Sequence, residues 1–282
     1  MQLILFFIRL FFKTFSFLAP KFAAYQAFEL FQKPHMEKTR ERELALYKEF
    51  SERRIPADKE DLYVYESGDE SGYPIILIHG WESNPGSMLG IANSLIEKGF
   101  RLIILGLPAH GKSKLKKTNM VHSSEMVKKL IDHYGFKKDF SMITHSFGSG
   151  VTSLALKDEE IYPDKLIFMT TPDRIWDIFT QFAETISLGE KAFKYLVDQV
   201  EKLSPISLSD FNISELVQKV NYTELFVIHD KFDKILPYKN ALNMKALNPK
   251  LTLYPTENKG HYRLLWDPEV IELIGHIIEK KS

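Results

Sequence analysis

The sequence lacks cysteine and has no excess of charge of either sign. Without cysteine there is no disulfide framework and no thiolate metal site, and any nucleophile must be another residue type. Lysine plus arginine total 37, aspartate plus glutamate also total 37, and the formal net charge is zero. This balance gives no electrostatic footprint for a nucleic acid, so we expect no nucleic-acid partner. We also expect no metal and no organic cofactor, because no cysteine and histidine ligand cluster is visible.

The first 31 residues lack an acid before Glu29 and hold nine of the chain's 21 phenylalanines. On a helical wheel the polar residues fall within about 60° of one another and leave a wide apolar face. These polar residues are Gln2, Arg9, Lys13 and Ser16. A transmembrane helix needs about 20 residues with few charges, and Arg9 and Lys13 interrupt such a run. We therefore predict that residues 1–33 form an amphipathic segment and that residues 1–31 lie on or shallowly in a membrane surface.

Two other interpretations of this segment stay open. A cleaved secretory signal needs a basic stretch before the apolar run and a small-residue cleavage site, and the first five residues carry no charge. The segment also fits an extra helix that packs on the protein, because amphipathic stripes usually face a core. The interpretation as a segment at a membrane surface leads us to expect a cytoplasmic protein that associates with a membrane through its N-terminal segment.

Buried strands alternate with helices along most of the chain. After a charged stretch at 34–58, which we predict to be a helical linker, short apolar runs bounded by turn residues recur. The predicted strands are 61–67, 74–80, 101–107, 140–146, 165–172, 224–230 and 250–255. Helical periodicity lies between them, for example at 86–98, 122–135 and 148–157. This order predicts an α/β domain at 59–282 whose mainly parallel central sheet carries helices on both faces.

One long interval, about 173–220, contains no predicted strand and has aromatic residues at helical spacing. We expect helices inserted between two strands of the sheet to form a lid, because active sites of such sheets lie beyond the carboxyl ends of the strands. Trp176 and Phe179 are then candidates for substrate binding. Their spacing suits plain packing of a helix onto the domain equally well.

The stretch THSFGSG, residues 144–150, follows an apolar run and precedes a helical one. This is the context in which a sharp strand-to-helix turn holds a nucleophilic serine at positive φ, with small residues two positions before and after it. Ser146 is the candidate nucleophile and Gly148 supplies the second small residue. Thr144 stands where glycine is the easiest fit.

An acid and a histidine follow the serine in the order that a catalytic triad on such a sheet requires. His261 lies in a loop after the last predicted strand, beside Gly260. Asp233 lies three residues beyond the strand 224–230, and Asp230 lies at the strand end. Position in the chain leaves both aspartates open as the partner of the imidazole.

The segments IHGW, LPAHGKS, THSFG, HDKFDKILP and KGHYRLL together resemble the α/β-hydrolase superfamily, in particular its lid-bearing serine esterases and lipases. The resemblance covers roughly residues 60 to 280. It implies that Ser146 is the nucleophile, Asp233 the acid and His261 the base. It also implies an oxyanion hole formed by the backbone N–H groups of Trp81 and Phe147.

The sequence departs from the family pattern at a few positions. Asp230 and Thr144 stand where the family usually has glycine, Gly106 where it has aspartate and Ala109 where it has glycine. The resemblance implies structural roles for His79, His110 and Ser113. None of the departures removes a catalytic group, but they leave the substrate open.

The sequence thus predicts a serine hydrolase that cleaves a small-molecule carboxylic ester of an apolar acyl group through an acyl-enzyme. Thioester, amide and carbon–carbon bond hydrolysis use the same groups and stay open. A binding or scaffold protein that keeps the fold without the reaction is the alternative of another class. The oligomeric state and the acyl length are not specified by the sequence.

Overall fold

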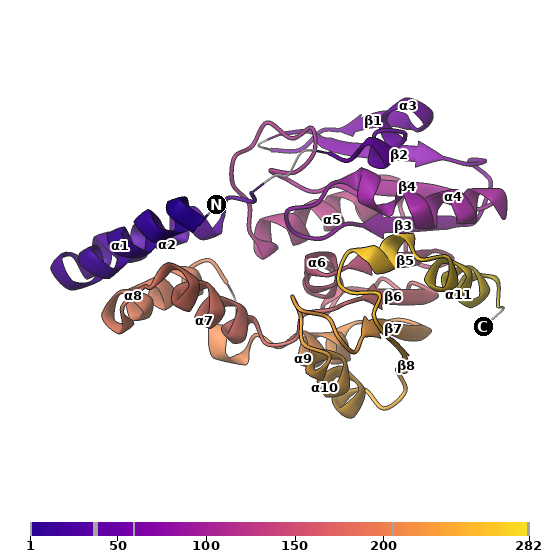
Figure 1. Cartoon of the computed structure of the whole chain (residues 1–282). Coiled ribbons are helices and arrows are strands. Elements are labelled where there is room, and N and C mark those ends of the chain that lie inside the picture. The colour runs from indigo at the N-terminus through magenta and orange to yellow at the C-terminus, as the bar shows by residue number, and fades with distance from the viewer. Residues whose placement is uncertain (1, 36–38, 59, 205, 281–282) are drawn as a thin grey trace. The chain divides into compact units, whose positions relative to one another are not determined.

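The computed structural model describes residues 2–35, 39–58, 60–204 and 206–280 (Figure 1). The chain forms two compact units. One consists of Met1–Pro34 with Arg174–Asn212, and the other of His35–Asp173 with Ile213–Ser282. The larger unit carries the sheet.

An eight-stranded sheet in the order β1-β2-β4-β3-β5-β6-β7-β8 forms the larger unit. Its strands are β1 (Ser51–Ile55), β2 (Leu62–Ser67), β3 (Pro74–Ile78), β4 (Arg101–Gly106), β5 (Ser141–His145), β6 (Lys165–Met169), β7 (Glu224–Asp230) and β8 (Thr252–Thr256). The pairs from β4 through β8 are parallel, and β1 and β2 join antiparallel at one edge. The predicted mainly parallel sheet is confirmed.

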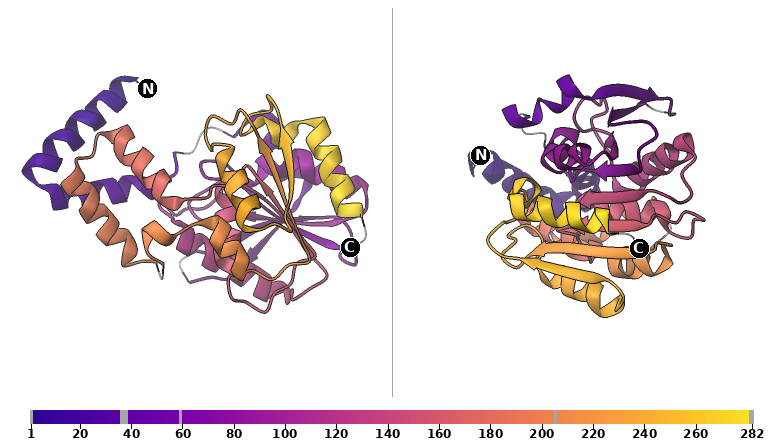
Figure 2. Two further views of the ribbon diagram at one scale, coloured as in Figure 1. Left: turned by 90° about the horizontal axis from the view of Figure 1, so that it is seen from below. Right: turned by 90° about the vertical axis from the view of Figure 1, so that its right-hand side faces the viewer.

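Helices cover both faces of this sheet (Figure 2). On one face α4 (Leu89–Glu97) packs against α11 (Pro268–Glu279), and their apolar sides join the core. On the other face α5 (Met120–Tyr134) packs on α6 (Phe147–Leu156), α6 contacts α9 (Ile213–Leu216), and α9 contacts α10 (Lys239–Leu247). With helices on both sides, β5 is buried along its whole length and β3 along nearly all of it, which explains their continuous apolar runs.

The predicted helical linker at 34–58 is wrong in its last part. Two short helical turns occur at Glu41–Glu43 and in α3 (Leu46–Glu49), but Ser51–Ile55 is strand β1. The register places Arg53 opposite Val64, and the Arg53 guanidinium bonds the carboxylate of Glu66 at 2.6 Å. Charged side chains on an edge strand resemble a linker in sequence, and they also protect the edge from further pairing.

The smaller unit is helical. It contains α1 (Gln2–Leu18), α2 (Pro20–Phe31), α7 (Ile175–Ile186), α8 (Glu190–Glu201) and a short turn at Leu208–Asp210. The main contact joins α2 to α8, and α2 presents the fully buried small residues Ala23, Ala24 and Ala27. In the described part of the chain, no helix is both long and apolar enough to cross a membrane.

Four buried imidazoles connect loops at the carboxyl edge of the sheet. His79 Nδ1 bonds Gly80 O and its Nε2 accepts from Leu107 N, and His110 Nε2 accepts from Glu82 N. His145 Nε2 bonds the carbonyl of His261 at 2.9 Å, and His229 Nε2 bonds the carbonyl of Leu236 at 3.0 Å. Burial lowers the pKa of all four, to about 4 for His110 and about 3 for His145. These neutral rings therefore hold the loops in place through hydrogen bonds.

Replacing Gly148 by alanine tests the close approach of α6 to β3. A Cβ at this position would lie 2.7 Å from Ile78 O and 2.8 Å from His79 O, which are backbone atoms that cannot rotate away. We expect Gly148→Ala to lower the free energy of unfolding in urea by about 1–3 kcal/mol. Gly150→Ala is the matched control on the same helix, because its Cβ would meet the flexible end of Met120 and gains helix propensity. Equal stability of the two variants would contradict this account.

The buried histidines predict a loss of stability in mild acid. In the unfolded chain they bind protons below about pH 6.5, whereas His145 in the fold binds one only near pH 3. Their contribution is therefore complete above pH 6.5 and is lost as the pH falls from 6.5 toward 3. We expect His145→Gln to flatten this fall in urea unfolding curves by about 1.4 kcal/mol per pH unit. Parallel curves for wild type and His145→Gln would refute the assignment.

Candidate active site

Ser146 sits at a sharp turn between β5 and α6. Its backbone has φ 52° and ψ −118°, an unfavourable conformation for a residue with a side chain. The turn is held by a bond from Ser146 N to Met169 O at 2.9 Å and by the absence of side chains at Gly148 and Gly80. A Cβ on Gly80 would lie 3.2 Å from the Cβ of Ser146. The strand, turn and helix expected from THSFGSG are thus present.

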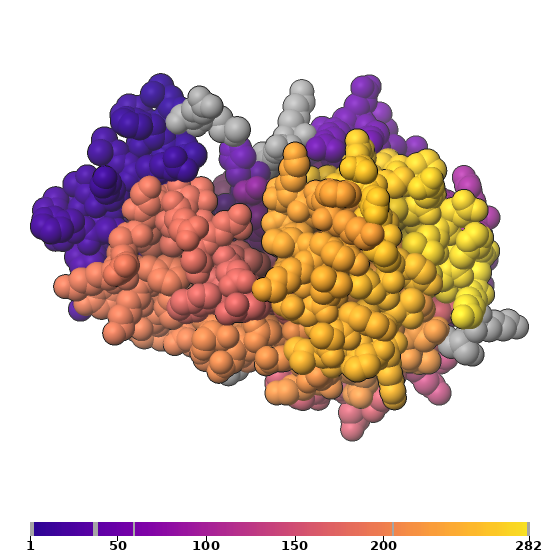
Figure 3. Space-filling view, turned by 60° about the horizontal axis from the view of Figure 1, so that its bottom comes forward, coloured from indigo at the N-terminus to yellow at the C-terminus, as the bar shows by residue number. Residues whose placement is uncertain are grey.

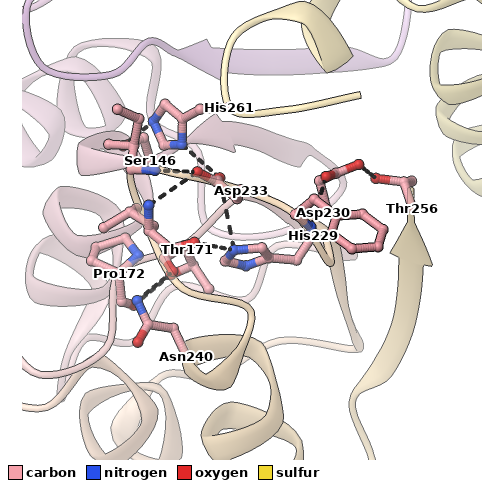
Figure 4. A network of polar contacts seen from close by, with 12 residues as sticks. Ser146, Thr171, Pro172, His229, Asp230, Asp233, Asn240, Thr256 and His261 are labelled. Carbon is pink, nitrogen blue, oxygen red and sulfur yellow. Dashed lines mark hydrogen bonds and ion pairs between the residues drawn. The ribbon is translucent and has the colours of Figure 1, made fainter. Parts of the chain in front are cut away.

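A chain of hydrogen bonds links Ser146, His261 and Asp233 (Figure 4). The Ser146 hydroxyl lies 3.0 Å from Nε2 of His261, and Nδ1 of His261 lies 2.8 Å from Oδ2 of Asp233. Because the ionised carboxylate only accepts, Nδ1 carries the proton and Nε2 is free to accept from the serine hydroxyl. Ser146 is 9% and His261 6% exposed, so little water competes with either bond.

The Asp233 carboxylate is oriented by its own loop. Its Oδ1 accepts from Ile235 N at 2.7 Å and from Leu236 N at 3.0 Å, which leaves Oδ2 for His261. Burial opposes ionisation of this carboxyl, but the bond and charge interaction with His261 and the two backbone donors outweigh it and lower its pKa. The side chain is therefore a carboxylate at neutral pH.

Asp230, the alternative acid, has other partners. It is completely buried, and its carboxylate accepts from Phe232 N at 3.0 Å, Lys259 N at 2.8 Å and Thr256 Oγ1 at 3.1 Å. The structure therefore brings Asp233, and not Asp230, to the imidazole of His261.

Trp81 and Phe147, the residues expected to form the oxyanion hole, come before and after Ser146 in the sequence. Trp81 follows β3 and Gly80, and Phe147 is the first residue of α6. Their rings meet edge to face with centroids 5.0 Å apart. The role of their backbone N–H groups stays a prediction.

Trp176 and Phe179, the predicted substrate-binding residues, belong to α7 in the helical unit. Phe179 is 5% exposed, and its ring lies 4.2 Å from that of Phe31, centroid to centroid. The Trp176 ring lies 5.5 Å from that of Phe193. Both side chains thus pack within their own unit, and a role in substrate binding stays a prediction.

Glu60 is a loop-bracing residue that the sequence did not reveal. Its carboxylate accepts from Ser113 Oγ and from Lys114 N, and Ser113 Oγ also accepts from Ala109 N at 2.9 Å. The carboxylate thus braces the loop that follows Gly106, the position where the family pattern has aspartate. Glu60 lies more than 50 residues from this loop in the sequence, so no local pattern linked the two.

The geometry matches the requirements of nucleophilic catalysis. A serine hydroxyl hydrogen-bonded to a neutral imidazole can lose its proton as it attacks a carbonyl carbon, and a carboxylate on the far side of the ring stabilises the imidazolium.

Comparisons with known proteins agree with this architecture. The family described as α/β hydrolase fold matches residues 73–203. A serine hydrolase-like protein of Danio rerio is 24% identical over 148 residues, which are 49% of this chain and 44% of that protein. The chain thus spans less than half the length of this relative.

Solved structures extend the likeness beyond the matched segment. An esterase of Pyrococcus furiosus, Pf2001, superimposes with a TM-score of 0.64 at 20% identity, covering 88% of this chain and 98% of that chain. A membrane phospholipase A described as a bacterial virulence factor gives 0.63 at 17% identity, covering 84% of this chain and 87% of that chain. With the strand order described above, these findings show that the chain has the α/β-hydrolase fold.

Proposed function

We propose that the protein is a serine hydrolase that cleaves a carboxylic ester of an apolar acyl group. The observation that carries this proposal is the continuous hydrogen-bond chain from Ser146 through His261 to Asp233. The names of the similar proteins, which include an esterase and a phospholipase, favour an ester as the substrate.

In the proposed reaction His261 takes the proton of Ser146 as the hydroxyl oxygen attacks the ester carbonyl. The negative charge that develops on the carbonyl oxygen would be held by the N–H groups of Trp81 and Phe147, each contributing about 3–4 kcal/mol to the transition state. His261 then gives its proton to the departing alkoxide, which leaves as the alcohol. Water, deprotonated by the same imidazole, releases the acid and restores Ser146. The reaction needs no cofactor.

We also propose that the protein is cytoplasmic and meets its substrate at a membrane surface, through residues 1–31. The membrane contact is supported by the many exposed phenylalanine and leucine side chains on α1. An enzyme held there would encounter esters with long acyl chains at high local concentration.

Replacing the nucleophile tests the function. We expect Ser146→Ala to lower kcat/KM for a p-nitrophenyl ester by at least about 10⁴-fold and to abolish labelling by a fluorophosphonate probe, because no other hydroxyl contacts His261 Nε2 among the bonds described. Ser153→Ala, which removes a buried hydroxyl from the same helix, is the matched control and should keep both properties. Comparing kcat/KM for p-nitrophenyl esters of different acyl length then shows which acyl length the enzyme prefers.

Two outcomes would overturn the proposal. Full activity in Ser146→Ala would place the reaction elsewhere. A folded wild type that neither hydrolyses any ester nor reacts with the probe would favour a binding or scaffold role for the same fold.

A further inference from the structure

Helix α1 turns its apolar side outward. Large apolar side chains recur along it at i, i+3, i+4 and i+7 spacing and are between 51% and 87% exposed. They are Leu3, Phe6, Phe7, Leu10, Phe17 and Leu18. The helix lies at the surface of its unit (Figure 3). We call these six residues the outer face of α1.

Another side of α1 packs on its own unit, and its half-buried or buried residues include Ile8, Phe12 and Phe15. Arg9 Nε donates to Thr185 O at 2.9 Å, and Ser16 Oγ accepts from Gly189 N at 2.9 Å. Phe12, which lies about 40° from Ser16 on the helical wheel, is 4% exposed. A surface helix in water normally presents a polar side to the solvent and only its apolar stripe to the core, whereas α1 has a second apolar side that is exposed. The outer face therefore needs an apolar neighbour that the described part of the chain does not supply.

Charge indicates which neighbour that is. Residues 1–34 carry four basic side chains and one acid, whereas residues 174–212 of the same unit carry four basic and six acidic side chains. Lys13 is exposed and lies about 20° from Phe6 and about 40° from Phe17 on the wheel. The outer face is thus apolar with a cationic edge.

We propose that the outer face of α1 docks on an anionic lipid bilayer, with the helix lying in the plane of the surface. The exposed apolar side chains run along all 17 residues, about 26 Å, so the whole length is in contact and not one end. A second copy of the chain is the less suitable occupant, because a two-fold pairing of this face brings like cationic edges together. This inference rests on the proposed membrane association and is independent of ester hydrolysis.

Flotation with vesicles tests the docking. We expect the full chain to float with phosphatidylcholine mixed with phosphatidylglycerol, more weakly with phosphatidylcholine alone, and less as salt rises. Phe6→Ser combined with Phe17→Ser should weaken partitioning about 100-fold, and Lys13→Gln about fivefold. The matched control replaces Tyr162 and Leu242 by serine, since these are 49% and 50% exposed on the other unit, and it should float like wild type.

The outcomes separate the occupants. Failure of wild type to float, or flotation of the phenylalanine variant at wild-type strength, would overturn the proposal. A wild-type dimer in light scattering that the phenylalanine variant converts to a monomer would assign the face to a second copy. Unchanged thermal melting and unchanged hydrolysis of a soluble ester show that the variants are intact, since Phe6 and Phe17 lie outside the catalytic machinery.

A second inference concerns Asp230. Its three donors belong to two loops: Phe232 precedes the acid Asp233, while Thr256 and Lys259 lead to His261. We infer that Asp230 is a positioning residue that fixes the distance between Asp233 and His261. Oδ2 takes two donors and Oδ1 takes one, so an amide in its place always turns its NH₂ group toward an N–H donor.

Asp230→Asn tests this role, which rests on the proposed function. We expect kcat to fall between about tenfold and 100-fold with KM little changed, and the low-field NMR signal of the proton between Asp233 and His261 to weaken. Asp173→Asn is the matched control, because Asp173 is also buried and accepts from Ser214 N and Asn243 Nδ2. It should lower thermal stability and leave kcat and the signal unchanged.

A merely structural Asp230 would behave like Asp173, losing stability while kcat and the NMR signal persist. That result would overturn the positioning role. If wild type hydrolyses no ester, the proposed function fails, and the NMR signal still decides whether Asp230 aligns the two side chains.

Discussion

The strained backbone of Ser146 is the constraint on which the site depends. A positive φ at a residue with a side chain persists only where its surroundings leave no alternative. Here Gly148 lets α6 approach the backbone of β3, and Gly80 leaves room for the Cβ of Ser146. The packing around the sheet therefore holds the Ser146 hydroxyl in a direction that the isolated segment would not adopt.

Asp233 and His261 are linked to that hydroxyl from two loops, and loops are usually more mobile than strands and helices. Buried polar groups supply the missing rigidity. His145 bonds the carbonyl of His261, His229 bonds that of Leu236, and Asp230 connects both loops. Because each of these groups is buried, a broken bond costs more than in water, so the loops are held in one arrangement.

The fold was largely predictable because buried parallel strands can be recognised in the sequence as apolar runs between turn residues. Strand β1 was missed because the charged residues on this edge strand give the same sequence pattern as a solvent-exposed helix. The serine turn could be located by its small neighbours, since a turn is a local feature. Position in the chain could not decide between Asp230 and Asp233, and only the family resemblance favoured Asp233. The role of Glu60 was not predictable, because it depends on which distant loop lies within hydrogen-bond reach.

The N-terminal segment forms an extra helix that packs on the protein, and its membrane contact stays a proposal. One side of α1 packs on protein through Phe12 and the hydrogen bonds of Arg9 and Ser16, and another apolar side stays exposed. Apolar surface that stays exposed in water costs free energy. Burial of the outer face in a bilayer would recover that free energy. The proposed membrane contact would therefore explain why α1 keeps an exposed apolar side.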